Sequence, residues 1–171
     1  QSYGRPFVIP GVARDSVLLL AVAAADRAMA LDRGLAAAWL AQGFVSRQVD
    51  PTDLAPASRS IRRALSIDST AADGWSMLAL GLAESGEHDE AFRAWRRAVT
   101  TGPSYPEGLA FFGLGHYWRR QYDSAMRWAD SAIAVDPGYL LGWTAVASTA
   151  LEQGNHARAA AAYEAARRLS T

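Results

Sequence analysis

The sequence AADGWSMLALGLAESGEHDEAFRAWRRAVTTGP, residues 71–103, contains two helical patterns separated by a glycine. Trp75, Leu78 and Leu82 follow one another at intervals of three and four residues, which places them on one face of a helix. Gly86 interrupts this pattern, and a short polar run leads into a second helical face. A proline ends the second pattern, so the stretch predicts one helix–turn–helix unit.

From Trp75 onward, this unit recurs along the chain with a period of 34 residues. The matching positions in the next two copies are Leu109, Phe112, Gly113, Ala125, Ala132 and Pro137, and then Trp143, Val146, Ala147, Ala150, Gly154, Ala159, Tyr163 and Ala166. The period and the residue pattern resemble the tetratricopeptide repeat (TPR) family. The resemblance implies an all-α fold, a right-handed α-solenoid in which each unit buries its apolar faces against its neighbours. Four units are expected, at residues 35–70, 71–104, 105–138 and 139–171.

The N-terminal part of the chain departs from the repeat. Residues 1–12 contain two prolines and two glycines and show no periodicity, so we expect an extended apolar arm. The arm either lies as a strap across the first helices or inserts into a partner. Residues 13–34 follow a helical pattern and resemble the second helix of a partial repeat. Because Gln1 is not a methionine, we expect a processed form or a piece of a longer protein.

Composition limits the classes of function. Lys+Arg and Asp+Glu number 17 each, the net charge is zero, and no cysteine is present. Disulfides, zinc–thiolate sites and thiol catalysis are therefore excluded. The balanced charge also argues against nucleic acid as a partner. All the basic residues are arginine and alanine is abundant, which is typical of a bacterial protein from a GC-rich genome.

The sequence contains no arrangement that predicts catalysis, a metal site or a cofactor. His88, His116 and His156 are widely separated, and no nucleophile, histidine and acid stand at a catalytic spacing. We therefore expect no enzyme activity, no metal and no cofactor. The longest apolar run, Val17 to Ala25, is too short to span a membrane. We expect a soluble protein of the bacterial cytoplasm or periplasm, and the sequence leaves both compartments open.

The resemblance also implies a binding surface, because in TPR folds the first helix of each unit lines a concave groove. The partner-binding residues expected there are Phe44, Met77, Leu80, Phe111, Leu114, Tyr117 and Trp118. Equivalent groove positions carry the acidic residues Asp73, Glu84, Glu107 and Glu152. A helix or an extended apolar segment would suit such a groove, with Phe111, Tyr117 and Trp118 as anchors. The alternative is that a tight superhelix, or the N-terminal arm, buries the same residues as core.

The sequence thus predicts a non-catalytic protein–protein interaction scaffold. It would bind an apolar segment or helix of a protein partner through its concave groove or through its terminal faces. Two alternatives stay open: a regulatory TPR domain cut from a larger signalling enzyme, and a fixed structural subunit of a larger complex, with or without attachment to a membrane. The last helix has a long alanine face that no capping helix follows, so we expect either that a partner or another copy covers this face or that the chain is cut from a longer protein.

Overall fold

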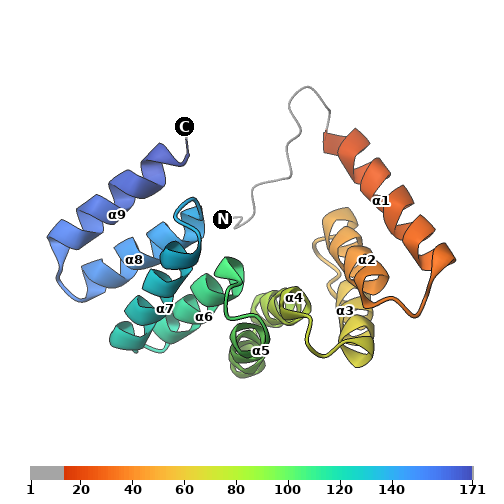
Figure 1. Ribbon diagram of the computed structural model, residues 1–171, viewed down its shortest axis with the longest axis horizontal. Helices are drawn as coiled ribbons and strands as arrows, with labels where there is room; N and C mark the ends of the chain where they lie inside the picture. Colours follow the sequence, from red (N-terminus) through yellow and green to blue (C-terminus); the bar gives the residue numbers. More distant parts are fainter. Residues whose placement is uncertain (1–13, 171) are drawn as a thin grey trace. The chain divides into compact units, whose positions relative to one another are not determined.

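The computed structural model describes residues 14–170, and these residues form nine α-helices and no strand (Figure 1). The helices are α1 (Arg14–Leu31), α2 (Ala36–Val49), α3 (Ala55–Ile67), α4 (Ala72–Glu84), α5 (His88–Thr101), α6 (Pro106–Trp118), α7 (Tyr122–Val135), α8 (Leu140–Glu152) and α9 (His156–Arg168). The all-α prediction is confirmed. The expected N-terminal arm, residues 1–12, lies outside the described residues.

The described residues divide into two compact units, a first unit that ends at Ser69 and a second unit that begins at Thr70. In the first unit, α2 packs against both α1 and α3. In the second unit the helices form the pairs α4/α5, α6/α7 and α8/α9, and each of α5 and α7 also contacts the first helix of the next pair. None of the helices in the described part of the chain is long and apolar enough to cross a membrane.

In the second unit the first helices of the pairs face one another. Helix α6 contacts both α4 and α8. The second helices α5, α7 and α9 make far fewer contacts with one another. Stacked helix pairs curve toward the side on which their helices lie closest together. The surface formed by α4, α6 and α8 is therefore the concave side of this unit, and we call it the first-helix face.

Small residues set the distance between paired helices. A Cβ atom on Gly43 of α2 would lie 2.7 Å from Cγ1 of Ile61, on α3. A Cβ atom on Gly113 of α6 would lie 3.2 Å from the carbonyl oxygen of Ala125 and 3.3 Å from the amide nitrogen of Ala129. Both glycines are buried, so a larger side chain at either position would push the two helices of the pair apart.

Three turns of the second unit share one backbone conformation. Gly86, Arg120 and Gly154 follow α4, α6 and α8 at equal intervals, with φ angles of 82°, 57° and 72°. A residue in this left-handed region commonly ends a helix and lets its last carbonyls find hydrogen-bond donors. Glycine adopts the conformation at little cost, whereas the Cβ of Arg120 makes it strained.

The turn between α2 and α3 is held differently. The carboxylate of Asp50 accepts hydrogen bonds from the Thr52 hydroxyl at 2.6 Å, the Thr52 amide at 2.9 Å and the Asp53 amide at 3.2 Å. These bonds, led by that of the Thr52 hydroxyl, lower the pKa of Asp50. Pro56 then occupies the first turn of α3, where a missing amide hydrogen costs nothing.

Candidate partner-binding surface

The largest exposed aromatic side chain of the first-helix face is that of Trp118, the last residue of α6, which is 58% exposed. Part of its ring is nevertheless packed against the protein. Its ring centroid lies 6.0 Å from that of Trp95, on α5, which is only 1% exposed. One side of Trp118 is therefore supported by the core while the rest of the ring stays open to solvent.

The buried Trp95 packs against two aromatic side chains of α6, those of Phe111 and Trp118. Phe111 stacks on it with the rings parallel to within 1° and their centroids 5.8 Å apart. Between Phe111 and Trp118 lies Gly115, where a Cβ atom would come within 3.4 Å of the Trp95 ring. The same Cβ atom would lie only 2.9 Å from Cδ2 of Phe92, so Phe92 more than Trp95 occupies the space that residue 115 leaves by having no side chain. The indole nitrogen of Trp95 is buried without a hydrogen-bond partner.

Tyr117, the residue before Trp118 on α6, reaches toward α8. Its hydroxyl donates a hydrogen bond of 3.4 Å to Oε1 of Glu152, on α8. Tyr122, whose ring meets that of Tyr117 edge to face, donates one of 3.1 Å to Oε2 of the same carboxylate. Desolvation, followed by the nearby charge and hydrogen bond of Glu152, raises the pKa of Tyr117. Leu114, on the same helix, packs against the core cluster of α7, α8 and α9.

The other predicted residues are more dispersed. Met77 and Leu80 lie on α4 and are half-buried, beside Ser76, which is fully buried with an unpartnered hydroxyl. Phe44 is 47% exposed on α2, so it belongs to the first unit. The structure brings Phe111 and Trp118 together around one core residue. It leaves Phe44 on a different unit from the other six candidates.

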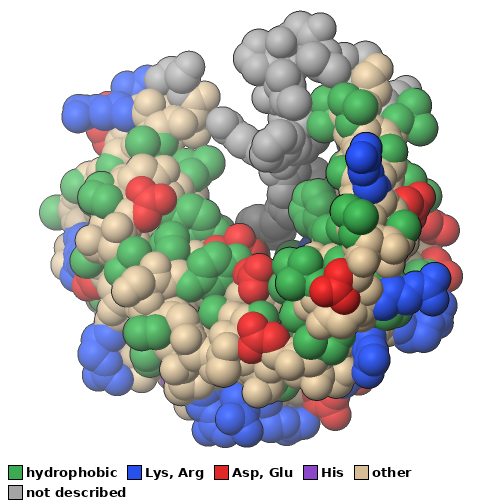
Figure 2. All heavy atoms as spheres, turned by 45° about the vertical axis from the view of Figure 1, so that its right-hand side comes forward, with side chains coloured by type: hydrophobic (Ala, Val, Ile, Leu, Met, Phe, Trp, Pro, Cys, Tyr) green, Lys and Arg blue, Asp and Glu red, His purple; other side chains and the backbone are tan. Residues whose placement is uncertain are grey.

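The first-helix face is also acidic. Helices α4, α6 and α8 carry Asp73, Glu84, Glu107 and Glu152, and none of the three contains an arginine or a lysine. The arginines of this unit's helices lie on α5, α7 and α9. In Figure 2, red carboxylate side chains lie among green apolar ones in the middle of the view, and further red side chains lie beside the blue arginine side chains at its edges.

Two tyrosines add partly buried hydroxyl groups at the other end of this face. Tyr105 and Tyr139 precede α6 and α8 at equivalent positions. Burial raises the pKa of both hydroxyls well above the ordinary value of 10.0, and the negative charge of Glu107 adds to the effect on each. Tyr105 also shares a hydrogen bond with Glu107. The groove positions expected from the sequence include the carboxylates but omit these two hydroxyls, although the repeat of the two tyrosines is visible in the sequence.

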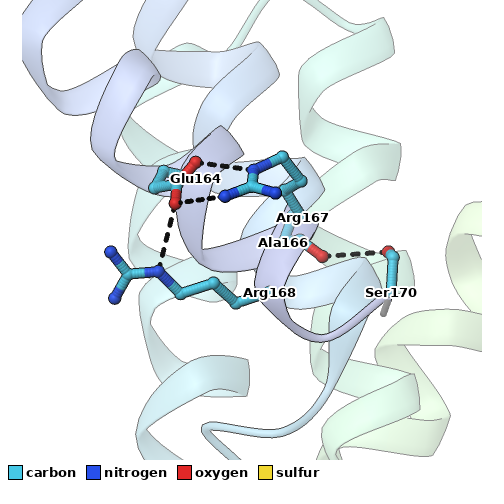
Figure 3. A network of polar contacts seen from close by, with 5 residues as sticks. All are labelled: Glu164, Ala166, Arg167, Arg168 and Ser170. Carbon is cyan, nitrogen blue, oxygen red and sulfur yellow. Dashed lines mark hydrogen bonds and ion pairs between the residues drawn. The ribbon is translucent and has the colours of Figure 1, made fainter.

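Three arginines that lie at helix ends of the second unit bind nearby carboxylates. Arg119, directly after α6, forms an ion pair with Asp89 and places its guanidinium 3.9 Å from the centre of the Phe92 ring. At the end of α9, Arg167 and Arg168 both bind the carboxylate of Glu164 (Figure 3). These hydrogen bonds lower the pKa of Glu164 to about 2. Paired in this way, these arginines do not form a free basic stripe.

His116 is held by contacts within the fold. His116 contacts the Phe92 and Phe112 rings, and its Nδ1 lies 2.7 Å from Oε1 of Gln121. In the described part of the chain, no three histidine, aspartate or glutamate side chains lie close enough together to hold a metal ion. The chemistry that the surface offers is therefore that of apolar contact, aromatic stacking and negative charge.

No protein-family model and no curated protein matches this sequence. Solved structures do match the fold. MamA covers 91% of this chain and 90% of its own, with 18% identity and a TM-score of 0.70. YrrB, a TPR protein with an unusual peptide-binding site, has 22% identity and a TM-score of 0.63, covering 91% of this chain and 79% of its own.

A third similar structure comes from the APC/C heterotetramer Cut9–Hcn1. It has 19% identity and a TM-score of 0.79, and the match covers 91% of this chain but only 29% of that one. All three identities are too low to transfer a function, but they agree on the architecture. The described chain has the all-α helical-repeat fold of TPR proteins, as the sequence pattern predicts.

Proposed function

From this TPR fold we propose that the chain is a non-catalytic interaction scaffold whose second unit binds an apolar segment of a protein partner on its first-helix face. The proposal rests on one observation, that Trp118 is exposed to solvent and also packs against the core. A tryptophan that is more than half exposed, yet supported from below by the buried Trp95, presents a large rigid surface at little ordering cost. Such aromatic side chains dominate the affinity of protein interfaces.

The neighbouring residues support the same use of the surface. Phe111 and Leu114 pack against core side chains and are partly buried. They therefore line the base of the surface, and Trp118 is the main anchor. Met77 and Leu80 of α4 extend the apolar area, and methionine adapts to different partner shapes. YrrB, which has this fold, is described as having a peptide-binding site, and this makes a peptide-like segment a reasonable occupant here.

The terminal faces provide a second candidate surface. Helix α9 leaves Tyr163 46% exposed, and the residue after this helix, Leu169, is 39% exposed. On α1, Leu19 and Leu20 are 69% and 66% exposed. Apolar side chains at the ends of a stack of repeats suit a role as a fixed subunit of a larger assembly.

The test is affinity capture of partners from the source organism with the wild-type chain, a Trp118→Ala variant and a Tyr163→Ala variant. We expect Trp118→Ala to lower the affinity for the captured partner at least tenfold. The free energy of unfolding should fall by less than about 1 kcal/mol, because most of the ring is already exposed. Tyr163→Ala removes a similarly exposed aromatic from α9 and should leave binding unchanged.

A different pattern of losses would assign binding to another surface. A partner retained by Trp118→Ala and lost by Tyr163→Ala would place binding on the terminal face of α9. A large loss of stability in Trp118→Ala, measured by urea unfolding, would show that the residue belongs to the core and would contradict the proposal.

A further inference from the structure

The charge of the first-helix face restricts what can bind there. Helices α4, α6 and α8 contribute four acidic residues and no arginine or lysine. A purely apolar or acidic segment that covers this face would take water away from carboxylates and bring them no positive charge, which is costly. A segment that carries positive charge meets complementary potential over the same area.

The C-terminal ends of these helices place the charges beside the aromatic anchor. Helices α4, α6 and α8 each span 13 residues and end at Glu84, Trp118 and Glu152 respectively. Because α6 contacts both α4 and α8, Trp118 lies between two helices that each end in a glutamate. The hydrogen bond from Tyr117 to Glu152 confirms that the ends of α6 and α8 are adjacent.

This arrangement matches the requirements of a guanidinium or ammonium group. A cation stacked on an indole face is attracted by the ring, and tryptophan is the best aromatic partner for it. The planar arginine side chain can stack and donate hydrogen bonds to a carboxylate at the same time. Tyr117 and Tyr122 hold the Glu152 carboxylate in place, so one acceptor is already oriented.

We infer that the occupant of this surface is a basic–apolar segment of a partner protein, with an arginine or lysine side chain on Trp118 between Glu84 and Glu152. The inference rests on the proposed function, because it names the partner class for the same face. Asp73 and Glu107, near the start of α4 and α6, extend the negative charge along the segment. Apolar side chains of the segment cover Met77, Leu80 and Phe111.

The experiment is selection of a random peptide display library on the full chain, in parallel with three variants. Glu84→Gln/Glu152→Gln removes the two terminal carboxylates and keeps their shape. Glu87→Gln/Glu90→Gln is the matched control, because both residues are exposed at the start of α5, a second helix. Trp118→Ala reports whether an enriched peptide uses this face at all.

The affinity of an enriched peptide is then compared with that of the same peptide in which citrulline replaces arginine. Citrulline keeps the shape and removes the charge. We expect enriched peptides to combine apolar residues with arginine or lysine, and citrulline to weaken binding to the wild-type chain about tenfold. On Glu84→Gln/Glu152→Gln the difference should fall below about twofold, while the control variant keeps it. Added salt should reduce the arginine advantage.

The outcomes separate the two claims. Enriched peptides that depend on Trp118 but carry no positive charge would overturn the basic–apolar class and leave the proposed function standing. An arginine advantage that survives in Glu84→Gln/Glu152→Gln would overturn the assignment of these two carboxylates. Selection that yields no peptide sensitive to Trp118→Ala would overturn both the inference and the proposed use of the first-helix face.

Discussion

Arg120 shows how a repeat can carry strain at a single residue. Its equivalents in the neighbouring pairs, Gly86 and Gly154, adopt the same positive φ without a Cβ atom. An L-residue with a side chain in this region costs about 1–2 kcal/mol relative to a relaxed backbone. The sequence pattern marks the position as a turn but does not reveal that the arginine follows the glycine conformation.

We therefore predict that Arg120→Gly stabilises the chain by about 0.5–1 kcal/mol, after the entropy cost of glycine in the unfolded state. Urea unfolding monitored by circular dichroism measures the change. Gly154→Ala is the converse control: nothing lies within 4 Å of an added Cβ, so the expected loss of about 1 kcal/mol would come from backbone strain alone. A loss of stability in Arg120→Gly would contradict the prediction.

Tyr105 leads to a prediction about pH. Burial raises the pKa of its hydroxyl above the ordinary value of 10.0, so the folded state holds the proton more tightly than the unfolded state does. This contribution to stability is complete below about pH 10 and is lost as the pH rises further. We expect Tyr105→Phe to reduce the fall in unfolding free energy between about pH 9 and pH 11, measured by urea titration. An unchanged slope would show that Tyr105 does not contribute.

At the scale of the element, the helix pair α6/α7 depends on contact between backbones. Alanine is the better helix former by about 1 kcal/mol, so Gly113→Ala would stabilise α6 if the site were roomy. The added Cβ would instead meet backbone atoms of α7 at 3.2 and 3.3 Å. Backbone atoms of a packed helix cannot rotate away as a side chain can.

We expect Gly113→Ala to destabilise the chain by about 1–3 kcal/mol because the pair must separate. The measurement is the free energy of unfolding in urea, and its sign decides the question. A gain in stability would mean that the helices of this pair have room to adjust. Ala147, which occupies the equivalent position of α8 and is fully buried, shows that another pair of the same unit accommodates this methyl group.

At the scale of the whole molecule, the division into two compact units has a consequence for folding. The three helix pairs of residues 70–171 make their contacts with one another, and their core includes the buried Trp95 and Val146. In stacked repeats, stability is the sum of terms for each repeat and for each neighbouring interface. Three pairs are enough to form a stable stack.

We predict that a fragment of residues 70–171 keeps its helical circular dichroism and binds any peptide that the first-helix face of the full chain binds. Its affinity should lie within about threefold of that of the full chain. Loss of the cooperative unfolding transition would contradict independent folding. Retained folding with lost binding would show that residues of the first unit are also needed for binding. The boundaries of the four repeats stay a prediction in either case.

The sequence by itself determined the secondary structure and the fold, because both depend on a local and repeated pattern. The spacing of Trp75, Leu78 and Leu82, together with the turn glycines, is sufficient for helix pairs, and their repetition at a constant period makes them stack. The groove positions came from the resemblance to TPR proteins, and as binding residues they stay a prediction. Which of them are anchors did not, because exposure depends on residues far away in the chain.

Only the tertiary structure decided that Phe111 is stacked on a buried indole while Trp118 remains 58% exposed. Both are aromatic residues on one helix and both contact Trp95, with centroid distances of 5.8 and 6.0 Å, so the difference lies in how much of each ring the surrounding helices cover. The separation of the acidic α4, α6 and α8 from the arginines of α5, α7 and α9 is visible in the sequence only once the helices are known to face opposite sides. A net charge of zero hides it, because the total does not depend on where the charges lie.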